Sequence, residues 1–267
     1  MLSELEVAQY KVFGFVVLSN FLKDDEVAGI EQAYERVMAK SLSHDYFGNA
    51  GTRVTRDVEN QDPTFASFVV HPHLIEAMKD IWGLPCLYFS SDVWLNRDDT
   101  PWHTDGMPGR SQISEVKVTL YLDEMTAQQG SLNLISGSHH PQVSESLFTE
   151  CGCWDSGRPR LRIERDKIPG AISLHTRPRD VVIWDTRLWH SAWKRQDGRP
   201  RRSLFFSFYP DPHDHLLKVD ALREECERKC QNRGEPMYGR NFLSHGDAHI
   251  QWMADRLEAI GVKHVRA

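Results

Sequence analysis

The chain has 267 residues, a length that suits one large domain with a substantial core. Its 38 acidic residues outnumber 32 lysines and arginines, and the resulting charge of −6 argues against a surface that binds nucleic acid. No apolar run is long enough to cross a membrane, the first residues lack the pattern of a secretion signal, and five cysteines do not make a disulfide framework. We therefore expect a cytoplasmic protein.

The first third of the sequence is predicted to be mostly helical. Apolar residues recur at helical spacing over residues 23–38, and acidic residues occupy the first turn. A second amphipathic helix is expected over residues 73–82, ending at Gly83.

From about Cys86 the pattern changes to short β-type runs separated by turn residues. Strands are predicted over residues 86–96, 116–124, 131–136, 171–176, 180–186 and 203–209. Such spacing favours an all-β sandwich or barrel over alternating βαβ units.

After Pro210 helical patterns return, over residues 220–230 and 248–260. Cys226 and Cys230 lie one helical turn apart, and we expect them on a solvated helix face. The predicted organisation is a single domain, 1–267, with a helical part (1–85), a β core (86–210) and a helical tail (211–267). The tail could cover the site or form a dimer contact, so a monomer and a homodimer both remain open.

A metal-binding pattern lies within the β region, in the segment PWHTDG. His103 and Asp105 are two residues apart, and on an extended strand their side chains point to the same face. A third ligand, His190, follows a later predicted strand. Two histidines and one carboxylate that leave open positions on the metal are typical of non-haem iron(II) oxygenases.

Three other segments resemble metal sites but fit structural roles better. His245-x-Asp247 repeats the spacing, yet it has no strand before it and reads as the capped start of a helix. We interpret His139-His140 as capping or hydrogen-bonding residues and residues 213–215 as a solvated turn. The pair Cys151 and Cys153 lacks a second ligand pair at zinc spacing.

A candidate carboxylate clamp follows the last metal ligand. Arg201 and Ser203 open a predicted strand and share one of its faces. A guanidinium pairs bidentately with a carboxylate, and a hydroxyl can add a hydrogen bond. Arg202 points to the other face, where we expect a solvated or surface-paired charge.

The segments TPWHTDG, LYLDEMTAQQGSLNLISGSH, DVVIWDTRLWHSA and RPRRSLFFSFY resemble the phytanoyl-CoA dioxygenase family of 2-oxoglutarate oxygenases, and the similarity spans most of the chain. The resemblance implies a double-stranded β-helix (jelly-roll, cupin-like) core. It also implies Fe(II) held by His103, Asp105 and His190, and 2-oxoglutarate held by Arg201 with help from Ser203. Thr104 and Tyr121 match positions that contact the co-substrate in relatives.

The implied reaction consumes O2 and 2-oxoglutarate and oxidises an aliphatic C–H bond of a small molecule, releasing succinate and carbon dioxide. Halogenating relatives replace the metal carboxylate by a small residue, so the intact Asp105 argues against halogenation. Candidate substrate contacts are the basic residues and one aromatic residue near these motifs: Arg53, Arg56, Arg158, Arg160 and Trp193. For the basic stretch 156–167, a solvated loop is the competing interpretation.

Two alternatives from other classes remain. One is a cupin-like metal-dependent hydrolase or isomerase, which would leave Arg201 unexplained. The other is a catalytically silent binding protein of the same fold, although such proteins usually lose a metal ligand. The sequence does not identify the substrate.

Overall fold

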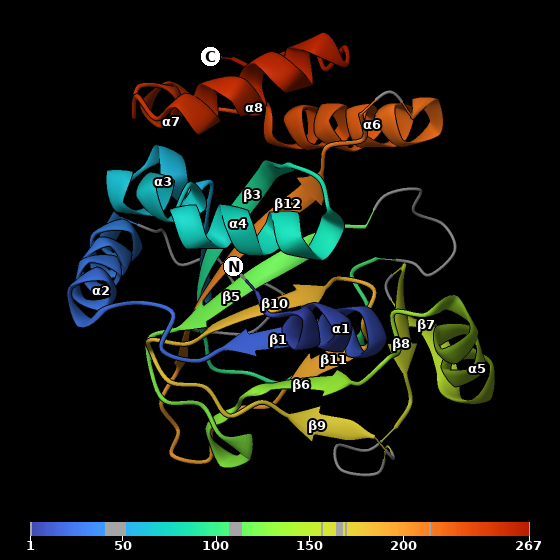
Figure 1. Ribbon diagram of the computed structural model, residues 1–267. Helices are drawn as coiled ribbons and strands as arrows, with labels where there is room; N and C mark the ends of the chain where they lie inside the picture. Colours follow the sequence, from blue (N-terminus) through green and yellow to red (C-terminus); the bar gives the residue numbers. More distant parts are fainter. Residues whose placement is uncertain are drawn as a thin grey trace.

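The computed structural model describes residues 2–40, 52–106, 114–155, 157–163, 168, 170–213 and 215–266. Its strands form two antiparallel sheets of six strands each (Figure 1). Sheet A runs, in hydrogen-bonded order, β1 (Phe15–Leu18), β10 (Val181–Asp185), β5 (Val116–Tyr121), β12 (Arg201–Pro210), β3 (Cys86–Asn96) and β2 (Arg53–Arg56). Sheet B runs β7 (Gly152–Asp155), β8 (Arg158–Leu161), β4 (Thr100–His103), β11 (His190–Ala192), β6 (Leu132–Ile135) and β9 (Ala171–Ser173). The predicted fold class, a jelly roll with flanking helices, is confirmed.

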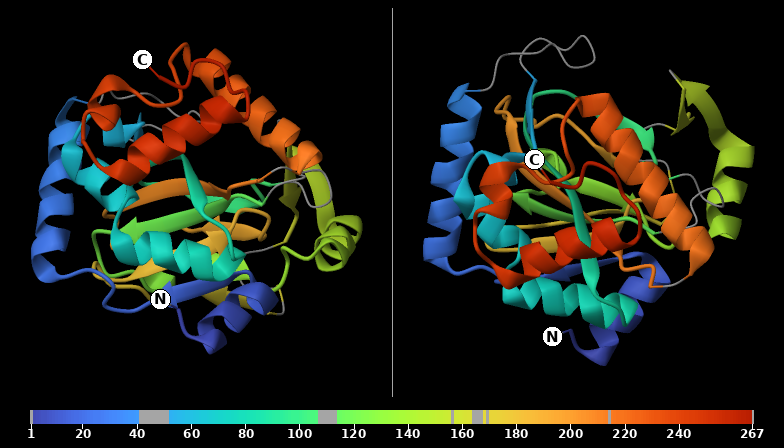
Figure 2. Two further views of the ribbon diagram at one scale, coloured as in Figure 1. Left: turned by 45° about the horizontal axis from the view of Figure 1, so that its top comes forward. Right: turned by 90° about the horizontal axis from the view of Figure 1, so that it is seen from above.

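Helices gather on the outer side of sheet A, and one helix lies beside sheet B (Figure 1). The helices are α1 (Glu4–Phe13), α2 (Asp24–Lys40), α3 (Pro63–Val69), α4 (Pro72–Trp82), α5 (Pro141–Cys151), α6 (Leu216–Arg233), α7 (Arg240–Leu243) and α8 (Ala248–Ala259), with short 3-10 turns η2 (Val58–Asn60) and η3 (Ala127–Gln129). Seen from above, α6, α7 and α8 lie across one end of the molecule (Figure 2). Among the described residues, no helix is long and apolar enough to cross a membrane.

The alternation of β12 separates the main hydrophobic core from the interior between the sheets. Phe206 and Phe208 are fully buried on the helix side, where Phe206 packs against Phe68 of α3 with ring centroids 4.8 Å apart. Arg201 and Ser203 occupy the alternate positions and face the other way. Strand β12 therefore has an apolar face toward the helices and a more polar face toward the interior between the sheets. The predicted carboxylate clamp, Arg201 with Ser203, lies on the second face.

The helix predictions over 23–38 and 73–82 are confirmed by α2 and α4. Helix α4 begins with Pro72 in its first turn and ends at Gly83, whose φ of 67° lies in the left-handed region that favours glycine.

Several local predictions were wrong or incomplete. The first third is mostly helical, as predicted, and it also contains β1 and β2, which pair with β10 and β3 at the two edges of sheet A. The sequence analysis also missed α5 and the hairpin of β7 and β8. Cys226 and Cys230 are 1% and 7% exposed, so the helix face expected to be solvated is instead packed into the core.

Candidate metal centre

His103 and His190 lie opposite each other on the neighbouring strands β4 and β11. Their ring centroids are 4.0 Å apart, and both side chains are more than nine-tenths buried. Asp105 follows β4 and points back toward both rings, with its carboxylate oxygens 3.6 Å from His103 Nε2 and 3.8 Å from His190 Nε2. The structure therefore brings the three predicted ligands together, with ligand atoms within 4.8 Å of one another.

Both imidazoles are oriented by backbone carbonyl groups. His103 Nδ1 lies 2.8 Å from the Pro101 carbonyl oxygen, and His190 Nδ1 lies 2.9 Å from that of Leu188. A proton on each Nδ1 leaves each Nε2 lone pair free toward Asp105, the orientation usual for metal-bound histidine. Burial lowers the pKa of His190. Burial also lowers the pKa of His103, and the neighbouring His190 ring lowers it further, to about 3. Both rings are therefore neutral near pH 7 and ready to bind a cation.

The backbone after β4 is fixed by the turn before β11. The amides of Asp105 and Gly106 both donate to the Thr186 carbonyl oxygen at 3.1 Å. The Thr104 hydroxyl lies 2.8 Å from the Gly106 carbonyl oxygen and 3.1 Å from that of Thr186. In this structure Thr104 thus holds the loop that carries the carboxylate ligand.

Lys117 places a cation beside the three ligands. Its ammonium donates to Asp105 Oδ2 and lies 5.6 Å from the centre of the Trp184 ring. Burial alone would raise the pKa of Asp105, but Lys117 and the two imidazoles hold it well below its usual range. The carboxylate is therefore ionised, as a metal ligand must be.

Arg201, Ser203 and Tyr121 lie together on the inner face of sheet A. Ser203 of β12 stands opposite Tyr121 of β5 in the strand register, and all three residues are less than 5% exposed. Burial lowers the pKa of Arg201, and it raises that of Tyr121 to about 12. This end of the site combines one buried guanidinium with two hydroxyl groups.

The Arg201 guanidinium is held by two carbonyl oxygens. It donates through Nη1 to Trp193 and through Nη2 to Asp98, the latter at 2.8 Å. An arginine has five N–H donors, so three remain for a ligand. Gly130 packs against this clamp, and a Cβ there would lie 2.4 Å from the Trp193 carbonyl oxygen and 2.9 Å from Arg201 Cδ. Trp193 therefore contributes its carbonyl, while its ring meets Trp102 edge-on.

Part of the basic segment after α5 forms a strand. Arg158 and Arg160 belong to β8, which pairs with β4, and Arg160 stands opposite His103. Arg158 is exposed, whereas Arg160 is half-buried. Sequence reasoning favoured a solvated loop, but residues 158–161 extend the sheet that bears the candidate metal ligands.

The two N-terminal candidates lie on opposite faces of β2. Arg53 faces the helices and donates to the Met38 carbonyl oxygen at 3.1 Å. Arg56 faces the other way and pairs with Asp92 at 3.6 Å, with 46% of its side chain exposed. Only Arg56 thus borders the interior between the sheets.

The other metal-like segments have structural roles in the described chain. Asp247 caps α8 by accepting from the His249 amide at 2.7 Å, as predicted for this second His-x-Asp. His139 and His140 contact carbonyl oxygens at the end of α1. His213 lies in a turn, and Asp214 between the two histidines is outside the described residues.

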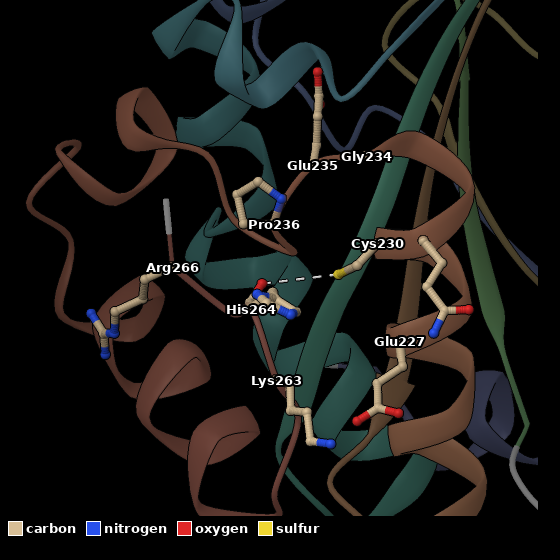
Figure 3. Close-up of a pocket in the computed structure, with 9 residues that line it drawn as sticks. Glu227, Cys230, Gly234, Glu235, Pro236, Lys263, His264 and Arg266 are labelled. Atoms are coloured by element: carbon tan, nitrogen blue, oxygen red, sulfur yellow. Dashed lines mark hydrogen bonds between the residues drawn. The ribbon is translucent and has the colours of Figure 1, made fainter.

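A hollow of about 490 Å³ lies between α6 and the C-terminal segment, lined by residues that include Cys230, Lys263 and His264 (Figure 3). The Cys230 thiol faces the His264 carbonyl oxygen at 3.9 Å. No predicted site residue lines it. The candidate metal ligands and Arg201 lie between the two sheets instead.

Sequence reasoning predicted Tyr121, Arg201 and Ser203 but missed other polar residues near the inner face of β5 and β12, among them Glu115 and Lys117. Glu115 accepts from the Tyr209 hydroxyl at 3.2 Å and lies beside Lys117. A signal was present, because Lys117, Thr119 and Tyr121 alternate with apolar residues and so share one face.

Comparison with known proteins gives one family match. A sequence model described as "Phytanoyl-CoA dioxygenase (PhyH)" matches residues 10–203. Ectoine dioxygenase of Bordetella parapertussis is 25% identical over 238 residues, covering 78% of this chain and 75% of that protein. Ectoine dioxygenase of Sphingopyxis alaskensis is 22% identical over 266 residues, covering 88% and 84%.

Solved structures share the fold. The epimerase SnoN, crystallised with Fe3+, alpha ketoglutarate and nogalamycin RO, superposes with a TM-score of 0.62 at 19% identity, covering 78% of this chain and 83% of SnoN. EctD from S. alaskensis gives a TM-score of 0.62 at 17% identity, covering 79% and 78%. The carbocyclase SnoK gives 0.59 at 20% identity, covering 79% and 85%.

Proposed function

Because the chain belongs to the phytanoyl-CoA dioxygenase family, we propose that it is an Fe(II)- and 2-oxoglutarate-dependent dioxygenase that hydroxylates, or otherwise oxidises, an aliphatic C–H bond of a small molecule. Succinate and carbon dioxide are the co-products. The observation that carries this proposal is the convergence of two bare imidazole nitrogens and one ionised carboxylate within 4.8 Å.

The donor set fits iron(II). Two neutral imidazoles and one carboxylate are borderline-hard ligands on one side of the site, which is the arrangement of non-haem iron oxygenases. His103, Asp105 and His190 would hold the metal, and the carbonyls of Pro101 and Leu188 would fix both rings. When bound, iron(II) supplies the activation of O2 with 2-oxoglutarate.

The other residues bind and orient the co-substrate. Arg201 has three N–H donors left for the distal carboxylate of 2-oxoglutarate. Ser203 and Tyr121 add hydroxyl groups next to Arg201. Trp184 is 1% exposed, and its ring lies against that of His190 with centroids 4.6 Å apart, so it helps to keep water out of the site. The Arg201 clamp also argues against a cupin-like hydrolase or isomerase, because such an enzyme does not need to bind the carboxylate of a co-substrate. The complete triad argues against a silent binding protein.

Anaerobic spectroscopy tests the proposal directly. Adding Fe(II) and 2-oxoglutarate to metal-free protein should give the weak visible charge-transfer band of a chelated keto acid. His103→Ala should abolish the band, whereas His245→Ala, in the second His-x-Asp, should keep it. The reverse pattern would mean that the metal binds at His245 and Asp247 and that the predicted site at His103 and Asp105 is wrong.

Turnover gives a second test. Iron-loaded protein should convert 2-oxoglutarate to succinate slowly in the presence of O2, and faster with its substrate. If no preparation that shows the band consumed 2-oxoglutarate, a silent binding protein would be the better description. A chlorinated product would contradict the use of Asp105 to exclude halogenation.

A further inference from the structure

Arg160 is a half-buried cation, with two buried nitrogen atoms, beside the candidate metal ligands, and the proposed function does not use it. It lies on β8 directly opposite His103 of β4. Side chains paired in this way on neighbouring antiparallel strands share a face, with Cβ atoms about 4.5–5.5 Å apart. Pro159 and Leu161 alternate with it and are buried on the opposite face, Leu161 beside Trp102. The Arg160 side chain is therefore directed to the same side of sheet B as His103.

Two of its three guanidinium nitrogen atoms have no acceptor among the described residues. Nε and Nη1 are both buried and have no hydrogen-bond acceptor there. Together these atoms carry three N–H groups. Burying charged donors without acceptors is unfavourable, so these donors are available to an acceptor that binds beside His103.

The charged groups around Arg160 do not neutralise it. Arg158 on the same strand repels it, and Asp155 stands opposite Arg158 rather than opposite Arg160. Asp105 is already paired with Lys117, and the metal would take it in the loaded protein. Burial lowers the pKa of Arg160, as it does for Arg201, whereas Arg195 and Arg202 have carboxylate partners and raised pKa values.

We propose that Arg160 binds an anionic oxygen group, a carboxylate or a phosphate, of the primary substrate next to the metal. This inference rests on the proposed function, because it assigns Arg201 to the co-substrate and leaves Arg160 for the substrate. The two guanidinium groups come from different sheets, Arg201 from sheet A and Arg160 from sheet B. The substrate would thus be an anion. Arg160 would hold its charged group and so position the carbon to be oxidised next to the metal.

Paramagnetic relaxation tests the inference without turnover. The protein is loaded with Mn(II) and saturating 2-oxoglutarate, and the relaxation of the methyl protons of acetate, methyl phosphate and acetamide is measured. Acetate or methyl phosphate should show saturable enhancement, and neutral acetamide should not. The stronger of the two anions identifies the group that the site prefers. Equal enhancement by acetamide would overturn the proposal.

Two variants separate Arg160 from its neighbours. Arg160→Gln should weaken anion binding by about tenfold or more, the loss expected for charged hydrogen bonds in a buried site. Arg160→Lys should recover part of it, and Arg162→Gln, an exposed arginine just beyond β8, should leave it unchanged. Unchanged anion binding in Arg160→Gln would overturn the inference.

The same samples distinguish this inference from the proposed function. If wild-type protein gives no Fe(II)–2-oxoglutarate band, the proposed function fails. If the band forms normally and no anion binds through Arg160, only the inference fails. If Arg160→Gln weakens 2-oxoglutarate as strongly as loss of Arg201, Arg160 serves the co-substrate and the inference is again wrong.

Discussion

Arg201 and Arg202 are adjacent in sequence but lie in opposite environments. Arg201 is 3% exposed on the inner face of sheet A and contacts two carbonyl oxygens. Arg202 points outward and pairs with Asp123 at 3.0 Å and with Glu31 of α2 at 2.7 Å. The period of two along a strand produces this separation, and it agrees with the surface-paired role predicted for Arg202.

Alanine substitutions at these two positions should have different effects. Removing a charged partner in a desolvated site costs roughly 2–5 kcal/mol, so Arg201→Ala should weaken 2-oxoglutarate binding about 30-fold or more. Arg202→Ala should change it by no more than about fivefold, while it lowers the free energy of unfolding through loss of its acidic partners. Anaerobic titration of 2-oxoglutarate into both iron-loaded variants measures this. The opposite ranking would mean that the register of β12 is shifted by one residue.

At the scale of elements, α3 depends on its N-cap residue, Asp62. Asp62 accepts from the Thr64 amide at 3.0 Å and pairs with Arg36 of α2 at 2.7 Å. Asp62→Ala should lower the free energy of unfolding by about 1–2 kcal/mol, the usual cost of a lost N-cap. Asp62→Asn should cost less, because an amide oxygen can still cap the helix while the pairing with half-exposed Arg36 is lost.

The effect of the charge should depend on pH in a defined direction. Although burial opposes it, hydrogen bonds from Arg36 and Thr64 lower the pKa of Asp62 in the folded state. A lowered folded pKa stabilises the protein above the unfolded value of about 4 and loses that contribution as pH falls. The difference between wild type and Asp62→Asn, measured by urea unfolding, should therefore be larger at about pH 7 than at about pH 3. If wild type and Asp62→Asn differed in free energy of unfolding by the same amount at both pH values, the charge of Asp62 would contribute nothing to stability.

The sequence predicts the elements whose own residues determine them. The β12 and β5 segments alternate long enough to identify strands, and α4 carries its own start and stop residues. Strands β1 and β2 span only four residues each and exist because sheet A offers edges to pair with. Cys226 was placed on the wrong face because a mostly polar helix does not reveal which side the core will cover.

The candidate site shows the same division. His103, Asp105 and His190 could be predicted because strand spacing and a downstream partner limit which residues can meet. Arg160 was predicted as a substrate contact and the alternation of β5 offered a signal for Lys117, but the places of these residues beside the triad depend on strand pairing far along the chain. Single charged residues in strands are ordinarily solvated, so the paired sheets are needed to show that these two lie beside the candidate metal ligands.

At the scale of the whole molecule, the C-terminal tail belongs to the main core. Tyr238 donates to the Tyr88 carbonyl oxygen of β3 at 2.7 Å, and its ring stacks with that of Tyr88. Lys229 of α6 donates to the Phe89 carbonyl oxygen at 2.6 Å and pairs with Asp57 at 3.2 Å. The tail and β3 therefore share buried contacts, which favours one cooperative folding unit.

Two leucines of α6 test this directly. Leu222 is 1% exposed within the main hydrophobic core, whereas Leu217, near the start of the same helix, is 61% exposed. Leu222→Ala should lower the free energy of unfolding by about 2–4 kcal/mol through lost burial and the cavity left behind, and Leu217→Ala by less than about 0.5 kcal/mol. Because the core is shared, Leu222→Ala should shift one cooperative transition that far-UV circular dichroism and tryptophan fluorescence report together. A separate early transition limited to helical signal, with the Fe(II)–2-oxoglutarate band retained, would instead mean that the tail is an appendage that folds independently of the jelly roll.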